Sequence, residues 1–198
     1  MKKLSISAIA VGVALLAASF TAPKADVTYK ADASATTITW TGKKVTGQHT
    51  GLVKLSKGTL VSDGKSFKSG SFDIDVTSIT TTDLTGEYAD KLIGHLKSED
   101  FFSVAKNPIS TLVITSFTLK SGNDYEAKGK LTIKGITSDI TFPATIKTDG
   151  NTVTADAVIT VDRTKYDIKY GSKKFFESIG DKAIYDDFEL AVKLVAKK

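Results

Sequence analysis

Two histidines, His49 and His95, are the side chains of this sequence best suited to acid–base chemistry at neutral pH. A serine triad built on either one would need partners that meet only in the fold, and nothing in the sequence selects a particular serine. The chain has no cysteine, no His-x-x-x-His pair, no Gly-x-Ser-x-Gly elbow and no phosphate-binding Gly-rich loop. We therefore expect no catalytic residue and no cofactor.

A metal site would require both histidines to meet beside a carboxylate. We favour a structural role for each, as a half-buried ring bonded to the backbone, and expect no metal ion. The first histidine stands in Gly47-Gln-His-Thr-Gly51, where two glycines let the backbone bend sharply, as at a bulge or a barrel rim. His49 would either contact a ligand head group there or hold the bend by hydrogen bonds, and the sequence favours neither interpretation.

A basic and aromatic cluster runs from Asp162 to Lys174. Its Arg163 offers a planar fork of donors that suits an anionic head group such as a diphosphate. The alternative is an ion pair between Arg163 and Asp162 or Asp167 at the end of a strand. The candidate contacts for a polar head group are His49, His95, Arg163 and Tyr170.

Hydrophobic and polar residues alternate along most of the chain after Val27, which predicts half-buried strands. In the segment 71–77, Phe72, Ile74 and Val76 lie on one face. The same period of two places Leu131 with Ile133, and Phe188 with Leu190, Val192 and Leu194.

Turn residues separate these strands at Ser62-Asp-Gly64, Ser121-Gly-Asn-Asp124 and Asp149-Gly-Asn151. About eight to ten short strands joined by hairpins predict an all-β antiparallel meander. Closure into an up-and-down barrel removes exposed sheet edges, and a two-sheet sandwich is the competing architecture.

One segment, at about 86–105, breaks the alternation and predicts a short α-helical element, with a helix over 87–98 and a second short turn over 100–105. Tyr88, Leu92, His95 and Leu96 share one helical face, and Thr85 is a plausible N-cap. Asn107-Pro108 would stop any helix. We expect this element to lie across the sheet.

The first residues predict export. A positive start at residues 1–3 precedes an uncharged apolar run at 4–20, which indicates a signal peptide over 1–22, cut between 19 and 25, and a single mature domain over 23–198. Removing Lys2 and Lys3 lowers the formal net charge from +5 to +3, and scattered lysines argue against nucleic acid as a partner. The expected location is periplasmic or secreted.

Three stretches carry a family resemblance: Trp40-Thr-Gly-Lys-Lys-Val-Thr-Gly-Gln-His-Thr-Gly51, His95-Leu-Lys-Ser-Glu-Asp-Phe-Phe-Ser-Val-Ala-Lys-Asn-Pro108, and Tyr125-Glu-Ala-Lys-Gly-Lys-Leu-Thr-Ile-Lys-Gly135. In this order and spacing the chain resembles the YceI-like family of secreted bacterial barrels. The resemblance implies an extended lipocalin-like barrel with a helical element, whose apolar interior binds a polyisoprenoid tail. Ser103 and Asp167 depart from the expected pattern, and the segment 173–187 is longer than in compact members.

We therefore expect a binding or carrier protein for a polyisoprenoid or similar long-chain amphiphilic lipid, such as an isoprenoid quinone or a prenyl diphosphate. A hydrolase or isomerase acting on an apolar substrate in the same cavity is the alternative, and an adaptor with a filled interior is a third hypothesis. A homodimer and a transient membrane contact stay open. Inward alternation and aromatic content suggest these residues for the apolar tail: Trp40, Phe72, Ile74, Leu92, Leu96, Phe101, Phe102, Leu112, Ile114, Leu131, Ile133 and Phe188.

Overall fold

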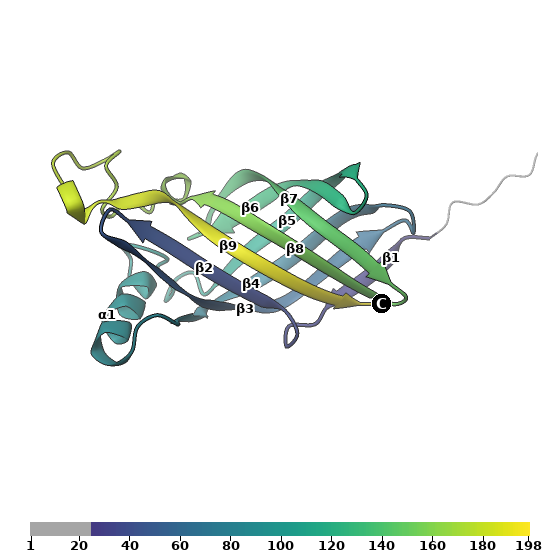
Figure 1. The fold of residues 1–198 in the computed structure, drawn as a ribbon, viewed down its shortest axis with the longest axis horizontal. Coiled ribbons are helices and arrows are strands. Elements are labelled where there is room, and N and C mark those ends of the chain that lie inside the picture. The colour runs from purple at the N-terminus through teal and green to yellow at the C-terminus, as the bar shows by residue number, and fades with distance from the viewer. Residues whose placement is uncertain (1–24) are drawn as a thin grey trace, which may run out of the picture.

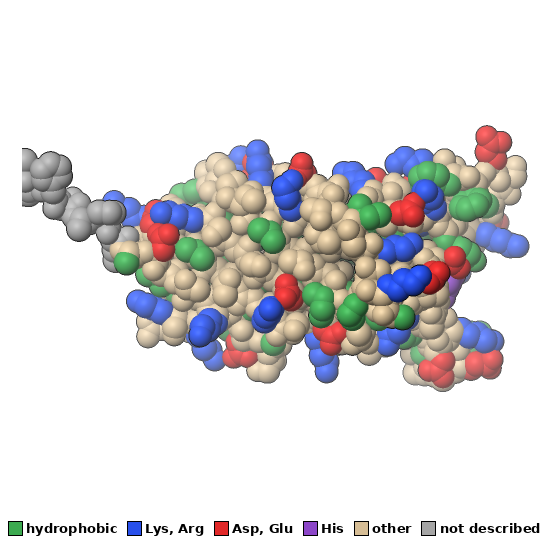
Figure 2. Space-filling view, turned by 180° about the vertical axis from the view of Figure 1, so that it is seen from behind, with side chains coloured by type: hydrophobic (Ala, Val, Ile, Leu, Met, Phe, Trp, Pro, Cys, Tyr) green, Lys and Arg blue, Asp and Glu red, His purple; other side chains and the backbone are tan. Residues whose placement is uncertain are grey.

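Antiparallel strands close into an elongated barrel in the computed structural model, which describes residues 25–198 (Figure 1 and Figure 2). The predicted signal peptide over 1–22 lies outside the described residues. The strands are β1 (Val27–Ala31), β2 (Thr37–Lys44), β3 (Gly47–Ser62), β4 (Phe67–Thr81), β5 (Ile109–Ser121), β6 (Asp124–Ile133), β7 (Ile136–Asp149), β8 (Thr152–Asp162) and β9 (Ile184–Lys197). The helices are α1 (Gly86–Lys97) and two 3-10 turns, η1 (Arg163–Tyr166) and η2 (Gly180–Lys182).

The strand order is that of an up-and-down meander. Each strand from β2 to β9 pairs with the next one in sequence, and β9 pairs back with β2. The barrel is therefore closed over eight strand positions, which confirms the predicted architecture and excludes the sandwich.

Strands β1 and β2 share one position in the barrel. Both pair with β3 and with β9, β1 near one end and β2 farther along. Between them the carboxylate of Asp32 accepts hydrogen bonds from the backbone N–H groups of Ser34 (3.1 Å) and Ala35 (3.2 Å). This local turn interrupts the strand, because the backbone N–H groups that bond to Asp32 cannot also pair with a neighbouring strand.

The predicted alternation holds along the strands. Phe72 and Val76 of β4 are buried and Ile74 is partly buried, and Leu131 and Ile133 of β6 are buried on the inner face. The hairpins at the three predicted turns also form, with Gly122 and Gly150 in the left-handed region at φ 51° and 55°. The period of two therefore correctly placed the inward-facing side chains of β4 and β6.

The predicted helical element over 86–105 is observed, with helix α1 as its first part and turns as its second, as the sequence indicated. Helix α1 ends at Lys97, because Ser98 adopts an extended conformation, and residues 98–107 continue as turns. These turns are held by hydrogen bonds such as Phe102 N–H to Leu96 O (3.1 Å). Thr85 occupies the N-cap position as predicted, but its side chain makes no cap hydrogen bond. The predicted element over 86–105 is thus one helix followed by a turn region.

The two ends of the barrel differ. Helix α1 and the segment before β9 lie at one end, and the C-terminus lies at the other (Figure 1). The C-terminal end is filled by an aromatic cluster in which Phe67 contacts Tyr29, Phe117 and Tyr125 at ring-centroid distances of 5.9–6.3 Å. In residues 25–198 there is no helix with the length and apolar character that spanning a bilayer requires.

Candidate functional site: an apolar cavity inside the barrel

Two adjoining cavities occupy the barrel interior. Their volumes, counted as space open to the centre of a water molecule, are about 110 Å³ and about 130 Å³. Each is several times larger than the roughly 10–15 Å³ that holds one water molecule. The two cavities adjoin along the barrel and have four lining residues in common: Val53, Ile74, Leu131 and Leu190.

The inner cavity, nearer the aromatic end, is almost purely hydrocarbon. Thr36 is the only residue with a polar side chain in its wall. The outer cavity lies toward α1, and the polar and charged residues in its wall include Lys43, Ser110, Arg163 and the carboxylate Asp187. A site of this kind suits a long apolar chain with a polar group at its outer end, because hydrocarbon gains by burial and a polar group does not.

Eleven of the twelve residues suggested for the apolar tail line one or both cavities. Phe72, Leu112 and Ile114 are in the inner wall, Ile74 and Leu131 in both, and Trp40, Leu96, Phe101, Phe102, Ile133 and Phe188 in the outer wall. Leu92 lines neither cavity and is partly exposed on α1. The helical spacing placed it beside Leu96, but α1 has no buried residue and only its last turn reaches the barrel interior.

Trp40 forms part of the outer wall through a close fit with two neighbouring strands. Its indole Nε1–H donates to the carbonyl oxygen of Thr80 on β4 (2.9 Å) and so crosses Gly51 of β3, with which Trp40 is paired. A Cβ atom on Gly51 would meet Thr80 O and would lie 2.7 Å from Trp40 Nε1. Position 51 must therefore be glycine for the Trp40 indole to reach Thr80.

His49 sits near the rim, outside the walls of both cavities. Its Nδ1 lies 2.7 Å from Oδ2 of Asp83, whose Oδ1 accepts hydrogen bonds from Thr50 N–H (3.0 Å) and Thr81 Oγ1–H (2.7 Å). Desolvation acts to raise the pKa of Asp83, but the hydrogen bonds from Thr81, His49 and Thr50 outweigh it and lower this pKa to about 2. The pair ties β3 to the segment after β4.

His95 packs against aromatic rings. It makes edge contacts with Phe101 (4.9 Å between ring centroids) and Tyr170 (4.5 Å), and its Nε2 lies 3.7 Å from Oδ2 of Asp100. Neither His95 nor the 46% exposed Tyr170 lines a cavity. These contacts fasten the C-terminal end of α1 to the chain after η1.

Arg163 is buried, with 3% of its surface exposed, at the outer end of the cavity. Its guanidinium donates to three backbone carbonyls, those of Ile168 (2.8 Å), Tyr185 (3.1 Å) and Ile184 (3.1 Å). The charge partner is Asp186 at 3.5 Å, so neither predicted partner, Asp162 nor Asp167, is the one observed. Asp162 instead caps η1 by accepting from Thr164 N–H (2.9 Å).

The predicted head-group residues therefore do not converge on one point. Only Arg163 borders the cavity, while each histidine has a carboxylate of its own. Within residues 25–198, no three His, Cys, Asp or Glu side chains are grouped so that they could hold a metal ion.

Comparison with known proteins agrees with this geometry. The sequence profile of the YceI-like domain matches residues 29–196, which is nearly the whole described chain. The chain belongs to the YceI-like domain family. A curated relative, Protein YceI of Escherichia coli O17:K52:H18, is 32% identical over 101 residues, and the match spans about half the length of each chain (51% of this one, 50% of the relative).

Two solved structures share the YceI-like barrel. BcnA of Burkholderia cenocepacia superposes with a TM-score of 0.69 at 25% identity, covering 84% of this chain and 99% of BcnA. A domain of Saccharophagus degradans, described as polyisoprenoid-binding and implicated in plant cell wall breakdown, gives a TM-score of 0.65 at 16% identity, covering 85% and 97%. At that identity the second likeness shows the fold alone.

Some lining residues of this YceI-like domain were missed by the sequence analysis. Phe142, Ala144 and Ile146 of β7, and Ala155, Ala157 and Ile159 of β8, all border the inner cavity. Their alternation follows the same period of two, so extending the pattern through both strands would have found them. Asp83, in contrast, carries no local signal, because its partner His49 is 34 residues away.

Proposed function

We propose that this YceI-like protein binds a polyisoprenoid or similar long-chain amphiphilic lipid inside the barrel and acts as a carrier rather than an enzyme. The observation that supports the proposal is the pair of adjoining, mainly hydrocarbon-walled cavities inside the barrel. An isoprenoid quinone and a prenyl diphosphate both match its character, an apolar interior with Lys43 and Arg163 near the outer end.

Simple energetics support tail binding. Burying one methylene group contributes about 0.8 kcal/mol, so one isoprene unit contributes roughly 3 kcal/mol at most. Association costs about 4–15 kcal/mol and micromolar affinity needs about 8 kcal/mol more, so about four to eight fully buried units would give micromolar affinity. Such a site needs few polar contacts, which fits a wall in which polar groups occur mainly at one end.

The alternative, a hydrolase or isomerase acting in the same cavity, finds less support. That hypothesis needs a titrating histidine facing the substrate. His49 and His95 lie outside both cavity walls, paired with Asp83 and Asp100. Head-group contacts by His49, His95, Arg163 and Tyr170 stay predictions, and Arg163 is the best placed of them because it alone borders the cavity.

We further propose that the protein works in the periplasm or is secreted, after cleavage of the signal peptide predicted over 1–22. The proposal rests on the charged start and apolar run of the first 20 residues. N-terminal mass determination of the accumulated protein, together with cell fractionation, tests it: an intact Met1 in a cytoplasmic fraction would overturn it.

Blocking the interior tests lipid binding directly. Leu131 lines both cavities, so Leu131→Trp should place a bulky ring inside the barrel and weaken uptake of an isoprenoid quinone at least about tenfold. The matched control is Val158→Trp, which adds the same ring at an outward-facing, 56% exposed position of β8. If Leu131→Trp fails to fold, Ala157→Leu fills less of the same cavity. Equal quinone uptake by the blocked and control variants would refute the proposal.

A further inference from the structure

A closed loop projects from the barrel end that carries α1 (Figure 1). It spans residues 172–183, and its two ends are joined because Ile184 N–H donates to Gly171 O (2.8 Å). Gly171 has φ +64°, and a Cβ there would approach the Ile184 side chain within 3.1 Å, so glycine is needed at this closure. The loop is also held to the hairpin between β2 and β3, where Val45 N–H donates to Ala183 O (3.1 Å).

The loop presents two adjacent phenylalanines to solvent. Phe175 and Phe176 are 45% and 48% exposed. Both are displayed by a turn around the fully buried Ser172, whose carbonyl oxygen accepts from Phe175 N–H (3.2 Å) and Phe176 N–H (3.0 Å). Two large, half-exposed apolar side chains, adjacent in sequence on a hydrogen-bonded turn of a projecting loop, are typical of an interaction surface.

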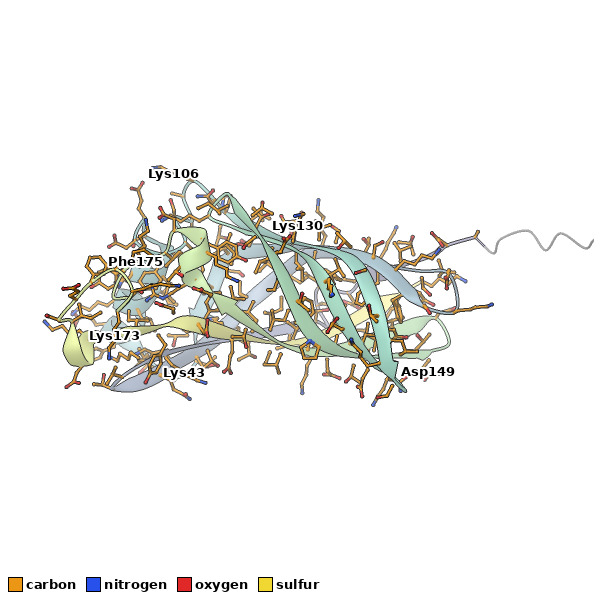
Figure 3. All side chains as sticks on the ribbon, turned by 90° about the horizontal axis from the view of Figure 1, so that it is seen from above. Lys43, Lys106, Lys130, Asp149, Lys173 and Phe175 are labelled. Atoms are coloured by element: carbon orange, nitrogen blue, oxygen red, sulfur yellow. The ribbon has the colours of Figure 1, made fainter. Side chains whose placement is uncertain are left out.

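Lysines outnumber acidic residues in and just before this loop, where Glu177 and Asp181 are the acidic residues of the loop itself. The segment 165–182 carries five lysines against three acidic residues, and Lys165, Lys173 and Lys182 make no ion pair within the described residues. Lys169 Nζ lies 5.3 Å from the centroid of the Phe175 ring. Phe175, Lys173 and Lys43 lie toward the same end of the molecule, with Asp149 at the opposite end (Figure 3).

We propose that residues 172–183, the docking loop, attach this end of the barrel to an anionic lipid bilayer. Phe175 and Phe176 insert among the acyl chains, while Lys173 and Lys182 contact the head groups. Aromatic rings beside lysines are the side chains that favour a membrane interface. Two rings on a convex tip are too small a patch for a stable protein–protein interface, which buries at least about 1,000 Å².

The position of the loop links membrane attachment to lipid entry. Ile184 and Tyr185, which directly follow the loop, belong to the outer cavity wall, so a docked bilayer would face the end at which a lipid enters. This link between attachment and lipid entry rests on the proposed function. Attachment itself does not, because it is carried by side chains that line neither cavity.

Vesicle co-sedimentation tests the proposal. The protein is used with the N-terminus that it has when isolated from the cells that make it. The unaltered chain should bind phosphatidylglycerol vesicles, bind phosphatidylcholine vesicles more weakly, and lose most of the difference in 1 M salt. Phe175→Ser with Phe176→Ser should weaken binding at least about tenfold, and Lys173→Gln about fivefold. Because these variants share the same N-terminus, that segment cannot account for the differences.

Two comparisons separate docking from cavity binding. The matched control, Leu119→Ser with Val158→Ser, removes two equally exposed hydrophobic residues elsewhere and should bind vesicles within about twofold of the unaltered chain. Leu131→Trp should keep vesicle binding while losing lipid uptake. No binding to anionic vesicles by the unaltered chain, or unchanged binding by the double phenylalanine variant, would overturn the docking proposal. If the unaltered chain binds vesicles but neither it nor any variant takes up lipid, only the proposed function is overturned.

Discussion

Trp40 and Gly51 show how a single residue pair shapes the cavity. The indole crosses the glycine to reach Thr80 O, so the wall of the outer cavity depends on the absence of a side chain one strand away. Both residues stood in the stretch that carried the family resemblance, but a sequence does not reveal that the glycine makes room for the tryptophan.

Gly51→Ala should therefore be strongly destabilising. Its methyl group would collide with Thr80 O and with the indole nitrogen, and overpacking of this kind costs about 1–3 kcal/mol or more. We expect the free energy of unfolding in urea to fall by at least about 2 kcal/mol. Gly42→Ala is the matched control on the neighbouring strand, where a Cβ would meet only Trp40 at 4.0 Å, and should change it by no more than about 0.5 kcal/mol. Equal effects of the two substitutions would contradict this packing account.

The pair His49–Asp83 predicts acid sensitivity. Because hydrogen bonds lower the pKa of Asp83 from 3.8 to about 2 in the folded protein, the folded state binds the proton less readily than the unfolded chain. Its contribution to stability is therefore present above pH 3.8 and lost as the pH falls toward 2. Asp83→Asn should flatten this part of the stability–pH curve, measured by urea unfolding from pH 5 to 2.

The control for this titration is Asp90→Asn at an exposed position of α1. It should leave the slope of the stability–pH curve unchanged. A curve for Asp83→Asn that still parallels the unaltered chain below pH 4 would show that the pair does not contribute in this way.

At the scale of elements, Arg163 joins three pieces of chain: the end of β8, the residues after η1 and the start of β9. Of its three carbonyl partners, Ile168 lies in the connection after η1, and Ile184 and Tyr185 are the first two residues of β9. The sequence analysis predicted a strand end with a basic cluster there, but assigned the wrong acidic partners. Asp186 was overlooked because it lies 23 residues further along the chain and meets Arg163 only when β8 and β9 pair.

Arg163→Met should destabilise the fold by about 3–5 kcal/mol, because it leaves buried carbonyls and Asp186 without their partner. Arg163→Lys keeps the charge but loses the planar fork, so we expect an intermediate loss of about 1–3 kcal/mol. Denaturant unfolding measures both, with the exposed Lys165→Met as the control near zero. Unchanged stability of Arg163→Lys, combined with weaker binding of a prenyl diphosphate, would instead support a pure head-group role.

At the scale of the whole molecule, the closed meander follows from local patterns that a sequence displays well. Alternation at Phe72, Ile74 and Val76, and turn residues such as Gly122 and Gly150, each need only a few neighbouring residues to be recognised. What could not be predicted depends on distant contacts or on one local hydrogen bond: the interruption at Asp32 and the exposure of Leu92. The cavity also could not be predicted, because only the closed structure shows whether the inward side chains fill the barrel or leave a space between them.

Native mass spectrometry of the gently purified protein tests the central claim, a hollow barrel occupied by a lipid tail, most directly. We predict a non-covalent adduct on the unaltered chain and on Val158→Trp, which organic extraction releases as a long-chain isoprenoid or similar amphiphile. The same measurement on Leu131→Trp should show the protein alone. A bare mass for the unaltered chain, persisting after incubation with an isoprenoid quinone, would contradict the account.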